Sequence, residues 1–194
     1  MSESGRSPTL TLVAVFVVVY LVQQVVALLN LQRVLFALSM PVERAPWTMV
    51  TSVYAHGSLP HLVGNAVVLL VVGLFLERQT SRARFHAFFL GSGVVAGLAE
   101  IWVGGLLDVS VAVWGASGAI FALVGYVLAG NRVADSALDS LPFSPRAQLV
   151  VFALVAAAVT VATAGRGVAL VAHFTGLLIG LLAGRAHLLR TSAA

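Results

Sequence analysis

The sequence predicts an all-α polytopic membrane protein, and its composition and hydropathy carry this prediction. Hydrophobic residues make up 60% of the 194 residues, and only 9% are charged. The mean hydropathy is +1.02, whereas a soluble domain carries about a quarter charged residues. The apolar residues gather into six runs, and a helix of about 20 apolar residues crosses a hydrocarbon core of about 30 Å. We therefore expect six transmembrane helices.

The six predicted spans form one membrane domain, residues 10–190, behind a short cytoplasmic tail of residues 1–9. They cover residues 10–29, 61–76, 85–102, 111–129, 149–164 and 168–188. The second and fifth are short, so we expect their ends to lie in the interface or inside the protein. The first run is longer than the apolar region of a signal peptide and has no small-residue cleavage motif behind it, so it is interpreted as a retained span.

Arginines indicate the orientation of the spans. Six spans place both termini on the same side, and positive charge accumulates on the cytoplasmic side. With cytoplasmic termini, the outer loops hold only Arg33, Arg44 and Arg166. The inner segments then hold the remaining arginines: Arg6, Arg78, Arg82, Arg84, Arg132, Arg146, Arg185 and Arg190. We therefore expect both termini to be cytoplasmic.

The remaining composition excludes several classes of function. The net charge of +4 comes from arginine alone, and so few charges indicate topology rather than a nucleic-acid surface. The chain has no cysteine, which excludes disulfides and cysteine-based metal sites. We expect no cofactor, no bound metal and no nucleic-acid partner.

The connections differ in character. Residues 30–60 contain too few consecutive apolar residues to span, so we expect them to lie in the outer headgroup region, with Trp47 and Tyr54 at the interface. Residues 130–145 are polar and rich in turn residues, among them Pro142, and are interpreted as a plain inner connector. Residues 165–167 are a tight outer turn. Glu100, near the outer end of the third span, is expected to be a solvated carboxylate.

One polar residue of the fourth span suggests chemistry. Ser117 lies in the segment Gly115-Ala116-Ser117-Gly118, at the head of an otherwise apolar run. A hydroxyl in hydrocarbon is costly unless it finds a partner, and neighbouring glycines let backbone or substrate approach closely. The pattern indicates a nucleophile with open amides beside it, for which His173 is the best candidate base. The alternative is a small packing residue in a membrane helix.

Three polar residues on alternate spans share one depth. Ser117, His173 and Asn65 each lie 12 to 15 residues before an arginine at the inner end of their span, which places them about 18–22 Å above the inner boundary. His61 lies one helical turn above Asn65 on the same face. The fourth and sixth spans also contain small residues that permit close helix packing: Gly118, Ala122, Gly125, Gly176, Gly180 and Gly184.

Together these residues resemble the rhomboid family of intramembrane serine proteases. The resemblance covers the chain from about Trp47 to Gly184 and rests on three motifs in register. They are His56-x4-His61-x3-Asn65, Gly115-Ala116-Ser117-Gly118, and Ala172-His173-x2-Gly176-x3-Gly180. Their order, spacing and host spans match a six-span prokaryotic rhomboid core.

The resemblance implies a role for each residue. Ser117 would be the nucleophile and His173 the general base, without a third carboxylate, and no acidic residue lies near His173 in the sequence. His61, Asn65 and the Ser117 backbone N–H would form the oxyanion hole. The supporting residues would be His56, Gly115, Gly118 and Phe121, while Gly176, Gly180 and Gly184 would only pack helices. Glu77, at the inner end of the second span, falls where rhomboids often carry a glutamate that anchors a loop.

Two positions depart from the family pattern. Thr48 follows Trp47 where rhomboids commonly have arginine, which concerns the anchoring of the first loop. Phe121 stands where a tyrosine often packs on the catalytic histidine, so the ring face is kept and the hydroxyl is not.

The resemblance implies a protease that hydrolyses a peptide bond in, or just outside, the transmembrane segment of another membrane protein. The active site would open to the outer side, and the substrate helix would enter laterally from the bilayer beside the fifth span. Its partners would be such segments and lipid, and no oligomeric state is inferred.

Other interpretations of the same residues stay open. One is a catalytically inactive rhomboid-like protein that binds transmembrane helices, and another is a small transporter or channel lined by Ser117, Asn65 and His173. Asn65 would then simply join two spans, and His56 and His61 would be interfacial. A zinc site of His56, His61 and His173 lacks the cysteine or carboxylate that such sites usually include.

Overall fold

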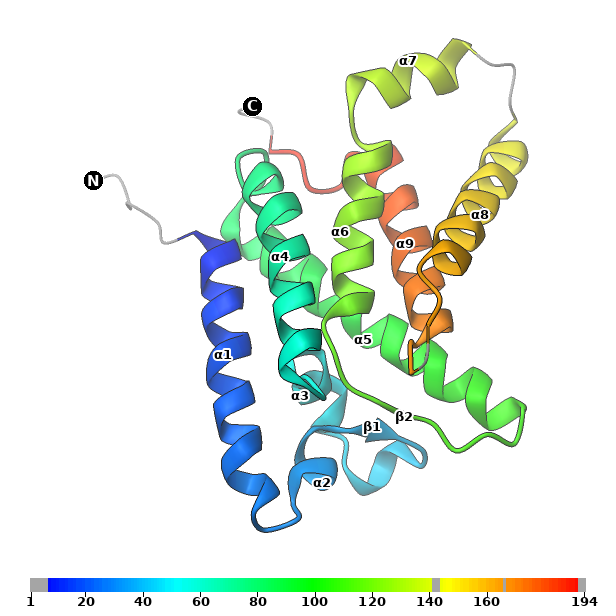
Figure 1. Cartoon of the computed structure of the whole chain (residues 1–194). Coiled ribbons are helices and arrows are strands. Elements are labelled where there is room, and N and C mark those ends of the chain that lie inside the picture. The colour runs from blue at the N-terminus through cyan, green and yellow to red at the C-terminus, as the bar shows by residue number, and fades with distance from the viewer. Residues whose placement is uncertain (1–6, 141–143, 166, 192–194) are drawn as a thin grey trace.

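The computed structural model describes residues 7–140, 144–165 and 167–191, and these form an all-α bundle (Figure 1). Its long helices are α1 (Pro8–Ala27), α4 (Leu59–Leu76), α5 (Arg82–Leu106), α6 (Ser117–Ala129), α8 (Pro145–Ala162) and α9 (Leu170–Arg185). The fold class predicted from the sequence is therefore confirmed. Arg6, Pro142 and Arg166, which entered the sequence predictions, lie outside the described residues, as does most of the predicted tail.

Four of the described helices, α1, α4, α5 and α8, are long and apolar enough to cross a membrane by themselves. The 16-residue α9 is a shorter apolar helix. The 13-residue α6 meets the length criterion only together with the segment beyond it, across a bend of 63°. Most predicted boundaries differ from the helix ends by two to four residues, because capping rather than hydropathy sets them. α8, for example, begins at Pro145 because Ser144 accepts the Ala147 N–H.

The fourth predicted span starts too early. Residues 111–116 are not helical: the short strand β2 (Ala112–Val113) pairs antiparallel with β1 (Leu38–Ser39), and the helix begins only at Ser117. Gly115 has a φ of +139°, which glycine adopts without strain. This conformation interrupts any helix through the segment. The serine consequently lies at a helix terminus instead of inside a span.

The inner loop also differs from the prediction. Residues 130–145 are not a plain connector, because they contain the helix α7 (Arg132–Ser140), which projects beyond the C-terminal end of α6 (Figure 1). Arg185 of α9 forms ion pairs with Asp135 at 3.4 Å and Asp139 at 2.7 Å. These exposed and half-exposed pairs hold α7 over the end of α9, and each contributes at most about 1 kcal/mol.

Both ends of the described chain meet the C-terminal end of α4. Glu77 accepts hydrogen bonds from the Ser7 hydroxyl at 2.6 Å and the Thr9 N–H at 3.1 Å. The Thr191 N–H donates to the Gln79 carbonyl at 3.3 Å. Burial raises the pKa of Glu77, but the hydrogen bonds from Ser7 and Thr9 outweigh it and hold that pKa below its usual range. The start of α1 and the end of α9 therefore lie on the same side of the bundle.

The loop between α1 and α4 is folded. It contains α2 (Gln32–Phe36), β1, a 3-10 turn (Val42–Arg44) and α3 (Thr48–Tyr54). The Trp47 indole N–H donates to the Val34 carbonyl at 3.2 Å, and the Thr51 hydroxyl donates to Leu35 at 2.7 Å. Thr48 is buried and its hydroxyl donates to Ala45 at 2.6 Å. Backbone acceptors thus anchor the loop without the family's arginine.

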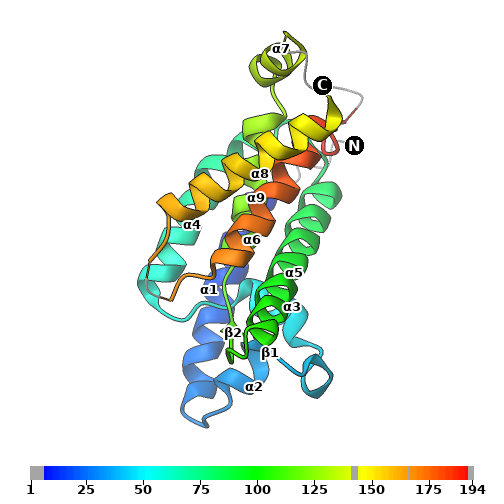
Figure 2. The same ribbon diagram turned by 90° about the vertical axis from the view of Figure 1, so that its right-hand side faces the viewer.

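The centre of the bundle is the contact between α6 and α9, which lie side by side in both views (Figures 1 and 2). Their glycines oppose backbone carbonyls: Gly176 lies against Gly118, Gly180 against Ala122, and Gly184 against Tyr126. A Cβ atom at any of the three would overlap the facing backbone. The two helices that carry Ser117 and His173 are therefore as close as backbone allows.

Candidate active site

Ser117 is the first residue of α6, and the chain reaches it through a fixed turn. The Gly115 N–H donates to the Ser52 carbonyl at 2.8 Å, and the Ile120 N–H donates to Ala116 at 2.9 Å. The first amides of a helix have no intrahelical acceptor, and the positive end of the helix dipole lies there. The hydroxyl therefore lies beside open N–H groups, as the sequence pattern predicts for a nucleophile.

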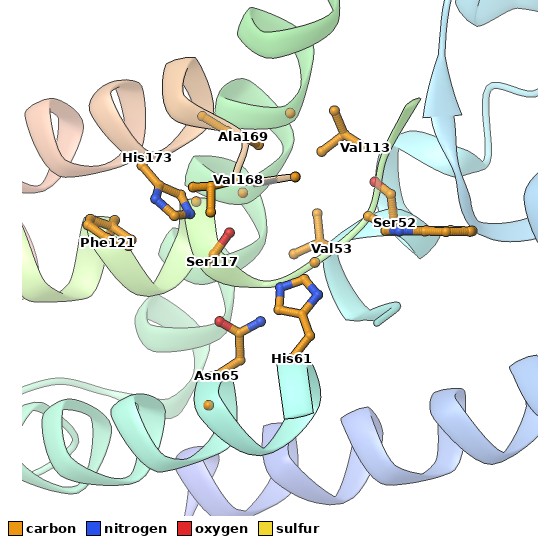
Figure 3. A pocket seen from close by; sticks show the side chains of 18 of the residues that line it. Ser52, Val53, His61, Asn65, Val113, Ser117, Phe121, Val168, Ala169 and His173 are labelled. Atoms are coloured by element: carbon orange, nitrogen blue, oxygen red, sulfur yellow. The ribbon is translucent and has the colours of Figure 1, made fainter. Parts of the chain in front are cut away.

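His173 is in the first turns of α9 and faces Ser117. Figure 3 shows the Ser117 and His173 side chains near each other, projecting from α6 and α9 into the same cavity. Phe121, one turn along α6, stacks on that ring with a centroid distance of 4.1 Å and an interplanar angle of 19°. The His173 side chain is buried, and its Nδ1 atom has no hydrogen-bond partner in the described chain. The ring face of Phe121 thus orients the imidazole, while the hydroxyl of a tyrosine is not needed for this contact.

His61 and Asn65 approach from the first turns of α4 on the opposite side of Ser117 (Figure 3). Ser58 caps this helix by accepting the His61 N–H at 3.3 Å. A Cβ at Gly115 would lie 2.7 Å from His61 Cε1, so only glycine lets the ring lie against the turn before Ser117. Asn65 is buried, and its Nδ2 donor has no partner in the part of the chain described. An amide donor is therefore free to bind an oxygen atom beside Ser117.

All four side chains line one cavity of about 550 Å³, together with Phe121. A neighbouring cavity of about 350 Å³ shares His61 and Trp114 with it and includes Glu100. Buried polar groups without partners are rare in folded proteins and point to a ligand or ordered water. Asn65 and His173 both carry such groups here.

His56 lies behind the cavity. It is fully buried, its N–H donates to the Gln23 side chain of α1 at 2.9 Å, and its ring meets that of His61 edge-on at 5.2 Å. Burial, and then the neighbouring His61, lower the pKa of His56 to about 4. The ring is therefore neutral at pH 7. It contacts His61, which lines the cavity, and not Ser117 itself.

One acidic residue belongs to the surroundings of the site against expectation. Glu100 is half-buried, and its Oε2 atom accepts the backbone N–H of Ala172 at 2.8 Å, so it is not simply solvated. No acidic residue lies near His173 in the sequence, but in the structure Glu100 contacts the residue directly before it. The sequence contains a signal for this role, because a carboxylate inside an apolar span costs free energy and usually has a function.

A zinc site is not supported by the geometry. The described residues contain no group of three or more histidine, aspartate, glutamate or cysteine side chains that could hold a metal ion. His56 faces Gln23 and the Tyr54 carbonyl, 3.2 Å from its Nδ1 atom. Its contacts are those of a structural residue.

Comparison with known proteins identifies the family. The family model of the Rhomboid domain matches residues 43–190. The chain belongs to the rhomboid family. The resemblance seen in the sequence motifs is thereby confirmed. The match includes every residue of the cavity described above and leaves residues 1–42 and 191–194 outside it.

Two curated rhomboid proteases are similar along most of this chain, and a third is similar along less than half of it. The rhomboid protease GlpG of Pectobacterium atrosepticum is 30% identical over 187 residues, which cover 94% of this chain and 63% of the relative. GlpG of Serratia proteamaculans is 28% identical over 179 residues, covering 90% and 60%. The putative rhomboid protease YdcA of Bacillus subtilis is 34% identical over 82 residues, covering 42% and 40%. The chain thus spans less than two thirds of the length of these relatives.

Proposed function

We propose that this rhomboid is an intramembrane serine protease that hydrolyses a peptide bond in, or next to, a transmembrane segment of a membrane protein. The observation that carries the proposal is that Ser117 and His173 project into one cavity, which His61 and Asn65 also line (Figure 3). Relatives similar over most of the chain are named rhomboid proteases. An inactive helix-binding protein or a transporter has no need for this pairing.

The proposed reaction uses the groups already described. Ser117 Oγ attacks the carbonyl carbon of the scissile bond while His173 takes the hydroxyl proton. The carbonyl oxygen becomes an oxyanion, which accepts hydrogen bonds from the Ser117 N–H, Asn65 and His61. His173 returns the proton to the leaving amine, and water then hydrolyses the acyl-serine ester by the same route.

The substrate is proposed to be a transmembrane helix that unwinds easily, because a peptide bond inside a helix is poorly exposed to attack. Lateral entry beside α8 is supported by the position of that helix at the edge of the bundle, packed mainly on α9 (Figure 1). Few of its residues are buried, namely Phe152, Ala156 and Thr160. We propose further that the termini are cytoplasmic, in a prokaryotic plasma membrane, so that the cavity opens outward.

The direct test is cleavage of a single-pass reporter by the purified protein in liposomes, with a fluorophosphonate or isocoumarin probe applied in parallel. We expect cleavage within or beside the reporter helix and covalent labelling of Ser117, read by mass spectrometry of the labelled peptide. A protein that binds the reporter but neither cleaves it nor takes the probe would support the inactive rhomboid-like alternative.

Asn65→Ala is expected to lower kcat by about 10²–10³-fold with little change in KM, because its amide acts only on the charge of the transition state. Steady-state cleavage of the same reporter measures both constants. Val67→Ala, on an exposed face of the same helix, is the matched control and should cleave normally. Equal kcat values for both variants would remove Asn65 from the oxyanion hole.

A further inference from the structure

Helix α9 begins without a cap of its own. Its N-cap position is Ala169, which provides no side-chain hydrogen bond, and Gly167 and Val168 before it carry no side-chain acceptor. The first N–H groups of a helix need acceptors from outside the helix. This matters because α9 carries His173 in its fourth position, one turn from its start.

Glu100 of α5 provides the missing acceptor from a distant part of the chain. Its Oε2 atom lies 2.8 Å from the Ala172 nitrogen, across 72 residues of sequence. Ala172 is the third residue of α9 and directly precedes His173, whose own N–H donates to the Ala169 carbonyl at 3.0 Å. The Glu100 contact therefore holds the Val171–Ala172 peptide unit, one residue before the one that carries the imidazole.

The same contact has an electrostatic consequence. A general base that accepts a proton becomes an imidazolium, and the positive end of a helix dipole opposes a positive charge nearby. A carboxylate at that helix end offsets the opposition. In serine proteases with a triad, one carboxylate both orients the imidazole and stabilises its charged form. Here no such carboxylate binds His173, whose Nδ1 atom has no partner in the described chain.

We propose that Glu100 is a positioning residue for the general base, and this inference rests on the proposed function. Phe121 holds the plane of the His173 ring by stacking, and Glu100 holds the first turn of α9 and places a negative charge at its positive end. The two tasks that one carboxylate performs in a triad are divided between an aromatic ring and a carboxylate that acts through the helix backbone. Glu100 itself touches neither substrate nor the reacting atoms.

Two variants separate the hydrogen bond from the charge. Glu100→Gln keeps an oxygen acceptor for the Ala172 N–H, whereas Glu100→Ala removes both acceptor and charge. We expect Glu100→Ala to lower kcat by about 10- to 100-fold, since a small displacement of a catalytic group has effects of this size. The kcat of Glu100→Gln should fall by only about 3- to 10-fold. This smaller loss is the part of the effect that comes from removing the negative charge at the helix end. KM should change by less than about two-fold in both.

The matched control is Asp108→Asn. Asp108 is an exposed carboxylate just beyond the end of α5, with a φ of +54° that asparagine also tolerates. Removing it takes one negative charge from the same end of the bundle without touching α9, and kcat should stay at the wild-type value.

Hydrogen exchange of residues 170–173 gives a second measurement that does not depend on proteolysis. Exchange should be faster in Glu100→Ala and near the wild-type rate in Glu100→Gln. Wild-type kcat in Glu100→Ala despite faster exchange would overturn the proposal. Equal losses of kcat in both variants with a lower melting temperature would overturn it as well, since Glu100 would then only support folding. A wild-type protein that does not cleave contradicts the proposed function instead, while exchange still reports on the cap.

Discussion

Replacing Ser117 by alanine is expected to abolish cleavage, with a loss of kcat on the order of 10⁶-fold, as for nucleophiles of other serine proteases. The reason is the position of Ser117 among the three serines that line the cavity. Ser58 accepts the His61 N–H as the cap of α4, and Ser52 lies in α3, whereas Ser117 lies near His173 (Figure 3). The oxyanion donors remain in the variant, but they have no tetrahedral oxyanion to bind without an attacking oxygen. Reporter cleavage in liposomes and probe labelling both measure this loss.

Ser92→Ala is the matched control for this variant. Ser92 is also a buried serine in a membrane helix, but its hydroxyl donates to the Phe88 carbonyl of its own helix at 2.7 Å. Its removal should leave cleavage and labelling unchanged. Undiminished cleavage by Ser117→Ala would mean that another group is the nucleophile and that the proposed mechanism is wrong.

The shared depth of the polar residues could be predicted from the sequence because depth follows from counting. Ser117, Asn65 and His173 interrupt apolar runs, and each run ends at an arginine that marks the inner boundary. The helical rise of 1.5 Å per residue then gives the level of each. The structure brings the three into one cavity. Counting could not give the rotation of the helices, which depends on how α6 and α9 pack.

The start of α6 could not be predicted in the same way, because hydropathy does not distinguish a short apolar strand from a helix. Val111, Ala112 and Val113 are apolar in either conformation, and only the pairing of β2 with β1 from a remote loop decides between them. The role of Glu100 depends in the same way on a contact across 72 residues. Long-range contacts of this kind leave no periodic signal in a single sequence.

Gly180→Ala is expected to be the most disruptive substitution outside the active site. The added Cβ would meet the carbonyl group of Ala122, with the carbonyl carbon 2.8 Å away. The new Cβ is fixed to the backbone of α9 and the carbonyl is part of the backbone of α6, so neither can rotate away as the end of a side chain would. The two helices must therefore separate. We expect a loss of stability of about 3 kcal/mol or more, at the upper end for overpacking.

The separation also displaces the helix that holds His173 from the helix that begins at Ser117, so cleavage should fall together with the melting temperature. Gly91→Ala is the matched control, since a Cβ on that exposed glycine of α5 meets nothing within 4 Å. There the same substitution should stabilise the helix by about 0.5–1 kcal/mol. Thermal unfolding in detergent compares the two variants, and equal melting temperatures would contradict the close backbone contact. In the proposed mechanism cleavage needs the two helices at this distance, so we expect the glycines of α9 to affect catalysis through packing alone.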